Sequence, residues 1–226
     1  MNHLKSLSGR RTMAARIIVY LAGIIILSFG ITLNTKTGLG VSPIISIPFS
    51  ISTLTQINLG TMTFIFYSLL VLLQILLLGR NFKIYQLLQV VMSLITSLFI
   101  NIFDQILPSA PNLPLKLILL AAAIIFTGLG ASLTVGMKIV PNPADGFADV
   151  LGQKLKKGFG FGKNVFDLSC ILLSLIIGLI FAGKIVGIGV GTIISMILTG
   201  RMVALCQGKL MKYYQRLTRS RSQGDH

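Results

Sequence analysis

The sequence contains no glutamate and no tryptophan, and only two histidines and two cysteines among its 226 residues. All of its acidity comes from five aspartates, against 20 lysines and arginines, so the formal net charge is +15. Charged residues make up 11% of the chain, whereas soluble domains carry about 25%. This scarcity of charge excludes an ordinary soluble enzyme, a disordered chain and a disulfide-rich secreted domain.

The few histidines and cysteines are also badly placed for chemistry. His3 and His226 lie at the two ends of the chain, and the two cysteines lie in apolar stretches without metal-ligand spacing. No H-E-x-x-H or G-x-S-x-G motif occurs. We therefore expect no enzyme activity, no metal site and no cofactor. The one enzymatic arrangement left open is an aspartyl pair, with Asp145 or Asp149 facing Asp167 from another span.

Long apolar runs dominate the sequence, which is 54% hydrophobic with a mean hydropathy of +0.87. Crossing the hydrocarbon core of a bilayer takes about 20 apolar residues in a helix. Six runs satisfy this length: Ile17–Thr35, Thr61–Leu78, Ile84–Phe103, Leu117–Met137, Val165–Ala182 and Ile185–Leu205. The sequence predicts six transmembrane helices.

Two further segments, 41–57 and 139–153, are apolar but irregular. The first carries six serines and threonines and two prolines, which favours an interrupted or re-entrant element over a continuous span. The predicted helix breaks are Pro43, Pro48, Pro141, Pro143 and Gly146. The fold class is thus an all-α polytopic membrane protein, with six transmembrane helices plus two interrupted or re-entrant elements. Eight spans remain the alternative if both irregular segments cross completely.

The basic residues predict the orientation. With both termini cytoplasmic and six spans, only Lys36, Lys116 and Lys184 lie outside. Eight spans would leave five cations outside, so the positive-inside rule favours six. The sequence pI near 10.4 is typical of nucleic-acid binding, but these cations flank apolar runs. We therefore expect them to contact anionic lipid headgroups at the cytoplasmic face, and we expect no nucleic acid partner.

Residues 30–105 and 128–207 share an order of features that indicates an internal repeat. GITLNTKTGLG (30–40) resembles GLGASLTVGMK (128–138), and a proline-bearing element follows each. A glycine, Gly60 or Gly162, then opens the next span. Three crossings in each half would give inverted topology, whereas four would give parallel halves. The predicted divisions are a basic N-terminus (1–13), a first repeat (14–106), an outer proline-rich linker (107–116), a second repeat (117–207) and a basic tail (208–226).

Several motifs together resemble the YczE/YyaS/YitT group of bacterial integral membrane proteins, specifically its YczE-like branch. They are GLGVSP (38–43), NLGTM (58–62), NPADGF (142–147) and VGIGVGT (186–192). The resemblance covers about residues 14–207 and implies a multi-pass protein of the bacterial inner membrane. The chain departs from the group's pattern by carrying Asp167 where glutamate is common and Gly200-Arg201 where Gly-Pro is common. The resemblance supplies no settled activity.

The second half holds three of the five acids in and beside its irregular element. Asp145 and Asp149 are one helical turn apart, and Asn142 is placed to cap a helix that starts at Pro143. They could form an ion or proton site, or they could stabilise the helix N-terminus and pair with nearby lysines. Asp167 could pair with Lys163 four residues earlier or face the bundle interior.

In the first half, Ser42 and Ser46 lie in the corresponding irregular element, and Asn34 lies beside it. Their side chains and the free backbone groups there could bind a solute, or the hydroxyls could bond to their own helix. The predicted function is a small-solute permease with its site at the repeat interface. The alternative is a non-transporting partner or assembly factor of another membrane complex. The chain could form a homo-oligomer or bind another membrane protein.

Overall fold

The computed structural model describes residues 2–218, with side chains described for residues 13–210. Throughout this part of the chain the regular elements are helices, and no strand occurs. The long helices are α1 (Asn2–Lys36), α3 (Leu59–Leu78), α4 (Leu88–Ile106), α5 (Leu113–Gly136), α7 (Phe159–Ala182) and α8 (Val190–Thr218). The short ones are α2 (Pro43–Thr55), α6 (Pro143–Lys154) and two 3₁₀ turns, η1 (Gly79–Asn81) and η2 (Ile84–Leu87).

Six helices are long and apolar enough to cross a membrane, as the sequence predicted. Each of the six predicted apolar runs overlaps one of the six long helices. The protein is therefore an all-helical, multi-pass membrane protein. The predicted basic tail begins inside α8, and its part beyond Thr218, including Asp225 and His226, lies outside the described residues.

The two irregular segments form short, continuous helices. Pro43 and Pro143 stand at the first helical positions of α2 and α6, where the missing proline N–H breaks no helical hydrogen bond. Pro141 lies in the loop before α6. Pro48 and Gly146 were predicted to be breaks, but they lie inside α2 and α6, which continue through them. Because Pro48 has no N–H, it only removes the donor that would otherwise bond to the Ile44 carbonyl.

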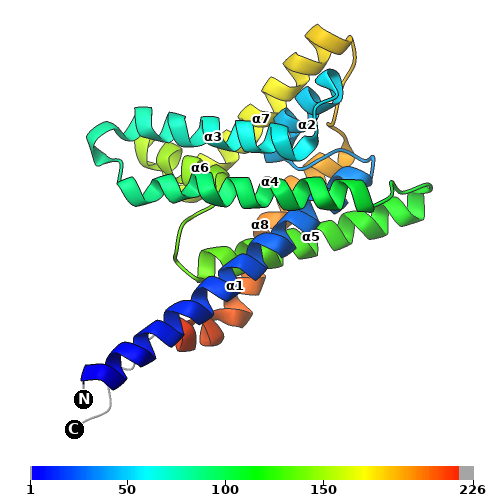
Figure 1. Cartoon of the computed structure of the whole chain (residues 1–226). Coiled ribbons are helices and arrows are strands. Elements are labelled where there is room, and N and C mark those ends of the chain that lie inside the picture. The colour runs from blue at the N-terminus through cyan, green and yellow to red at the C-terminus, as the bar shows by residue number, and fades with distance from the viewer. Residues whose placement is uncertain (1, 219–226) are drawn as a thin grey trace.

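The bundle has two ends that differ in what they hold. The start of α1, the end of α8, the turn over 79–87 and the turn between α6 and α7 lie at the end that is on the left in Figure 1, here called the terminal end. The connections α4–α5 and α7–α8 lie at the other end, here called the linker end. The loop after α1 runs back into the bundle before α2 returns toward the linker end, whereas α6 runs from the interior toward the terminal end.

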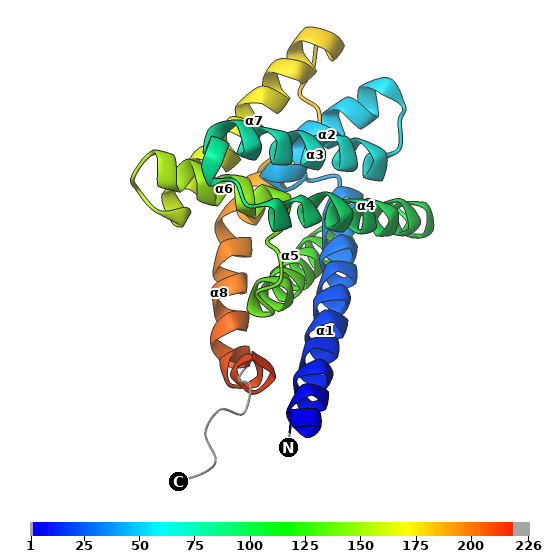
Figure 2. The same ribbon diagram turned by 60° about the vertical axis from the view of Figure 1, so that its left-hand side comes forward.

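Helices α1 and α5 cross at the centre of the molecule (Figure 2), and small residues allow their backbones to approach closely. A Cβ on Gly130 would lie 2.4 Å from the Leu27 amide nitrogen, so only glycine fits there. Helix α4 packs on α1 and α8 packs on α5. Helix α2 packs on α3 and α7, and α6 packs on the same two helices.

The last span starts later than predicted, at Val190 instead of Ile185. Gly187 has a positive φ of 72°, and its carbonyl accepts a hydrogen bond from the Val41 amide at 2.8 Å. The Gly191 amide donates to the Leu39 carbonyl, also at 2.8 Å. The glycines before α8 therefore bind the loop between α1 and α2, which keeps residues 183–189 out of the helix.

Candidate functional site

A cavity of about 910 Å³ lies between the two halves of the chain. Its walls include the first turns of both short helices, with Ser42 and Pro43 from α2 and Asn142 from the start of α6. Parts of α1, α3, α5, α7 and α8 complete the walls. Exposed lining residues such as Lys83 and Gln153 come from the terminal end, so the cavity reaches the surface there.

The start of α6 is capped by the residue directly before the helix. The Asn142 side chain accepts a hydrogen bond from the Ala144 amide at 3.0 Å, which fulfils the predicted N-cap. Asp145 lies in the first turn, where a carboxylate offsets the positive end of the helix dipole. The N-terminus of α6 is thus electrostatically compensated where it meets the cavity.

A pair of buried amides holds α6 in place. Gln74 of α3 and Gln89 of α4 are both fully buried, and each donates to the other, at 3.1 and 3.3 Å. Gln74 also donates to the Pro143 carbonyl at 3.2 Å. A Cβ on Gly146 would lie 2.9 Å from the Gln74 amide oxygen, so a larger residue there would displace this amide.

Three ionisable side chains form a cluster at the cavity wall. The Lys163 ammonium lies 3.6 Å from a carboxylate oxygen of Asp145 and 3.6 Å from one of Asp167. Asp167 is buried, with 7% of its side chain exposed, whereas Asp145 and Lys163 are about one quarter exposed. The lysine therefore joins an acid on α6 to an acid on α7, and both predicted relations of Asp167 hold: it pairs with Lys163 and it faces the interior.

Both acids of this cluster lie away from the nearer ends of their helices. Asp167 is eight residues into α7, about 12 Å along the helix axis from Phe159. Asp145 is nine residues before the end of α6, about 14 Å from Lys154. Ionisable groups within the hydrocarbon core of a membrane are costly and are usually functional.

The N-terminus of α2 differs from that of α6. Ser42 occupies the N-cap position and lines the cavity, but its side chain makes no capping hydrogen bond. The first turn of α2 also carries no acid. Beside it, the Ile44 carbonyl lacks its helical donor because residue 48 is proline. The cavity is thus lined by two helix N-termini: an acid in the first turn offsets the helix dipole of α6, and no acid does so in α2.

Three other predicted site residues lie apart from the ion cluster. Ser46 is fully buried between α2 and α7, where it donates to the carbonyls of Pro43 and Cys170. Asn34 is buried and donates to Ser195 of α8 at 3.1 Å, while its amide oxygen has no hydrogen-bond partner among the described residues. Asp149 is exposed at the cavity wall and accepts a hydrogen bond from Gln153.

Sequence reasoning predicted one contact of the central member of the cluster and missed the other. The pairing of Lys163 with Asp167 was predicted from their spacing of four residues, which places both on one helix face. The contact of Lys163 with Asp145 of α6 was not predicted. Gln74 and Gln89 were also missed, although an amide within an apolar span is itself unusual. Nothing in the sequence indicated that these two amides meet.

The donor set of the cavity suits hydrogen bonding and charge pairing. Within the residues whose side chains are described, no three of His, Cys, Asp and Glu gather closely enough to hold a metal ion. The polar side chains at the cavity instead carry carboxylates, ammonium groups, hydroxyls and amides. Such an arrangement can bind and orient a polar or charged solute.

The sequence matches a family of unknown function, DUF6198, over residues 14–208. No curated protein matches the chain, and no solved structure does. The matched region takes in all six spanning segments, both short helices and every residue of the ion cluster. The chain therefore belongs to the DUF6198 family of unknown function.

Proposed function

We propose that the protein transports a small polar solute, with its binding site in the cavity between the two halves. The observation that carries this proposal is the convergence of both short-helix N-termini and a buried ion cluster on one cavity. In secondary transporters, substrate sites lie near the bilayer midplane beside interrupted helices. A cavity of about 910 Å³ has the size of a small-molecule site.

We further infer that the two halves are inverted repeats. Helices α1 and α5 end at Lys36 and Gly136, α2 and α6 begin at Pro43 and Pro143, and α3 and α7 begin at Leu59 and Phe159. Each pair of positions is separated by 100 residues. Each half contains three spans, an odd number, which requires the halves to insert in opposite directions.

The packing at the centre supports a two-fold relation between the halves. A Cβ on Gly30 would lie 2.4 Å from the Thr127 amide nitrogen, and a Cβ on Gly130 would lie 2.4 Å from the Leu27 amide nitrogen. Adding 100 to the number of Gly30 gives Gly130, and subtracting 100 from the number of Thr127 gives Leu27, so each contact is the counterpart of the other. The packing of α2 on α7 corresponds in the same way to that of α3 on α6.

The charge distribution supports placing the terminal end in the cytoplasm. The turns at that end carry Lys83, Lys154 and Lys156, whereas Lys184 lies at the linker end. The positive-inside rule then puts both termini inside, with the basic residues against anionic headgroups. The bacterial inner membrane follows from the YczE-like resemblance, and kinship with that group stays a prediction from sequence.

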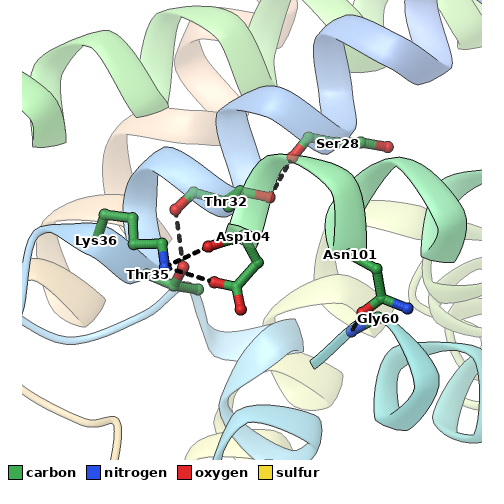
Figure 3. Close-up of polar contacts among 7 residues, drawn as sticks. All are labelled: Ser28, Thr32, Thr35, Lys36, Gly60, Asn101 and Asp104. Carbon is green, nitrogen blue, oxygen red and sulfur yellow. Dashed lines mark hydrogen bonds and ion pairs between the residues drawn. The ribbon is translucent and has the colours of Figure 1, made fainter. Parts of the chain in front are cut away.

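Contacts at the linker end support a state that is closed on that side. Figure 3 shows Lys36 at the end of α1 pairing with Asp104 near the end of α4. The Lys36 ammonium lies 2.8 Å from both a carboxylate oxygen and the backbone carbonyl of Asp104. The Ala110 amide donates to the Lys36 carbonyl at 3.0 Å. These contacts and the loop pairing of Leu39 with Gly191 hold the elements at the linker end together.

Cysteine accessibility tests alternating access without knowledge of the solute. Ser42 is replaced by cysteine in a chain whose own Cys170 and Cys206 are changed to alanine. A membrane-impermeant maleimide is then added to either side of the membrane. We expect Ser42→Cys to react from the terminal side, and in a fraction of molecules from the linker side.

Ser50→Cys is the matched control, because Ser50 is fully buried between α2 and α7 and should react from neither side. Modification of Ser42→Cys from one side only, under every condition and also with Lys36→Met, would contradict alternating access. A stoichiometric partner that co-purifies with the chain would instead favour the assembly-factor alternative.

A further inference from the structure

With all three of its groups ionised, the ion cluster has one negative charge more than it has positive charges. Asp145 and Asp167 contribute two carboxylates, whereas Lys163 contributes one ammonium. The other described charged residues of the cavity wall, Lys83 and Asp149, are exposed toward the terminal end. A charge that lacks a partner in a low-dielectric region is costly. One additional positive charge would balance the cluster.

The geometry leaves room for that charge at Asp167. The Lys163 ammonium is 3.6 Å from each carboxylate, longer than the roughly 2.8 Å of a charge-assisted hydrogen bond. Asp167 Oδ1 is buried and accepts no hydrogen bond from any described residue. Asp167 nevertheless lines the cavity. Its carboxylate therefore retains an acceptor, which a donor from the cavity reaches once the groups that cover Oδ1 move aside.

The surrounding wall favours an organic cation over a metal ion. Only two carboxylates meet at Lys163, whereas Ca²⁺ and Mg²⁺ take six or more oxygen ligands. Apolar side chains also line the cavity, including Leu27 and Ile31 of α1 and Ile45 of α2. A protonated amine with a short carbon chain matches both the carboxylates and the apolar wall. Its ammonium donates hydrogen bonds to the carboxylates, and its carbon chain packs on the apolar side chains.

We propose that the Asp145–Lys163–Asp167 cluster recognises the ammonium group of a small amine-bearing solute. The solute ammonium binds Asp167 from the cavity and shares it with Lys163, while Lys163 keeps its contact with Asp145. Binding brings the charge of the cluster to zero. This inference names the substrate class of the proposed transporter and rests on that function for its physiological meaning, but binding itself can be measured without transport.

The test uses two probes of matched size, n-butylamine and 1-butanol, on the purified full chain. Binding is measured by isothermal titration calorimetry in detergent at constant ionic strength, with sodium chloride replacing the amine salt in the control. We expect the amine to bind at least about tenfold more tightly than the alcohol, which corresponds to one favourable charge contact. Equal affinity for both probes would overturn the inference.

Two substitutions change the affinity in opposite directions. Asp167→Asn removes the acceptor charge and should weaken amine binding about tenfold or more. Lys163→Met removes the competing ammonium and should strengthen it about tenfold. The gain in Lys163→Met cannot arise from misfolding, so this variant keeps the test valid if Asp167→Asn is unstable. Unchanged or weaker binding by Lys163→Met would contradict the shared-site arrangement.

Lys157→Met is the matched lysine control, because Lys157 is exposed and lies over the Phe161 ring outside the cluster. Its amine affinity should match that of the unmodified chain, and a gain like that of Lys163→Met would overturn the inference. If the protein binds the amine but transports none into vesicles, the proposed transport function is contradicted and the amine-binding site is retained. If it transports charged and uncharged solutes equally well, only the inference about amines is contradicted.

Discussion

Gln74 and Gln89 bond to each other through both of their side-chain amides, in a region from which water is excluded. The pair connects α3 to α4 and supports the first turn of α6 through the Pro143 carbonyl. It therefore couples a transmembrane hairpin of the first half to the short helix of the second half.

Replacing Gln89 with leucine should destabilise the protein by about 1 kcal/mol, because the Gln74 amide then loses a partner inside the membrane. The double variant Gln74→Leu/Gln89→Leu should lose less than the sum of the single variants, since it leaves no orphaned amide in the pair. Unfolding can be followed with a thiol-reactive dye, because Cys170 and Cys206 are both buried and free. Additive losses would show that the two amides act independently.

Gly130→Ala should destabilise the crossing of α1 and α5 strongly. The added Cβ would lie 2.4 Å from the Leu27 amide nitrogen, which is backbone and cannot move aside. Overpacking of this kind costs about 1–3 kcal/mol or more. Thermal unfolding with the same dye measures the loss.

Gly200→Ala is the matched control for the crossing, because a Cβ at Gly200 of α8 would meet nothing within 4 Å. Alanine also favours a helix by about 1 kcal/mol relative to glycine. We expect this variant to be at least as stable as the unmodified chain. Equal losses at both positions would mean that close packing of α1 on α5 is not what Gly130 provides.

Lys36→Met should open the linker end while changing stability little. The pair with Asp104 is partly exposed, with 17% and 37% of the two side chains accessible, so its net contribution is about 1 kcal/mol or less. Removing it should raise the labelling rate of Ser42→Cys from the linker side. Lys184→Met, which changes an exposed lysine at the same end, should leave that rate as it was.

Asp145→Asn should impair transport more than Asp149→Asn. Asp145 lies 3.6 Å from the Lys163 ammonium, whereas Asp149 is exposed and bonds to the neutral Gln153 amide. Without Asp145, Lys163 retains only Asp167, so the two form a neutral pair that has no surplus charge for a cationic solute. Initial uptake rates in proteoliposomes compare the two variants. A larger defect in Asp149→Asn would place the functional acid at the cavity mouth instead.

The six spans could be predicted because hydrocarbon thickness imposes a length that an apolar run either meets or does not. Asn142 could be predicted as an N-cap because capping depends only on neighbours in the chain. Pro48 and Gly146 were misjudged because a short helix can continue through a residue that removes one backbone donor or one side chain. Here α6 continues through Gly146 because the Gln74–Gln89 pair fills the space beside it.

The contacts of the ion cluster could be predicted within one helix but not between helices. Lys163 and Asp167 share a helix face, so their contact follows from spacing alone. The contact with Asp145 depends on how α6 packs on α7, which glycine makes possible: a Cβ on Gly162 would lie 2.2 Å from the Ala148 carbonyl oxygen. The sequence marks both glycines and acids but does not specify which helices they bring together.

The pair at the linker end has no equivalent at the terminal end. Adding 100 to the number of Lys36 gives Gly136, which cannot form an ion pair. Under the proposed alternating access, the state open at the terminal end would therefore hold an ion pair at this position that its mirror state lacks. A difference of about 1 kcal/mol makes the favoured state roughly fivefold more populated. A single lysine would thus set the resting side of the cycle.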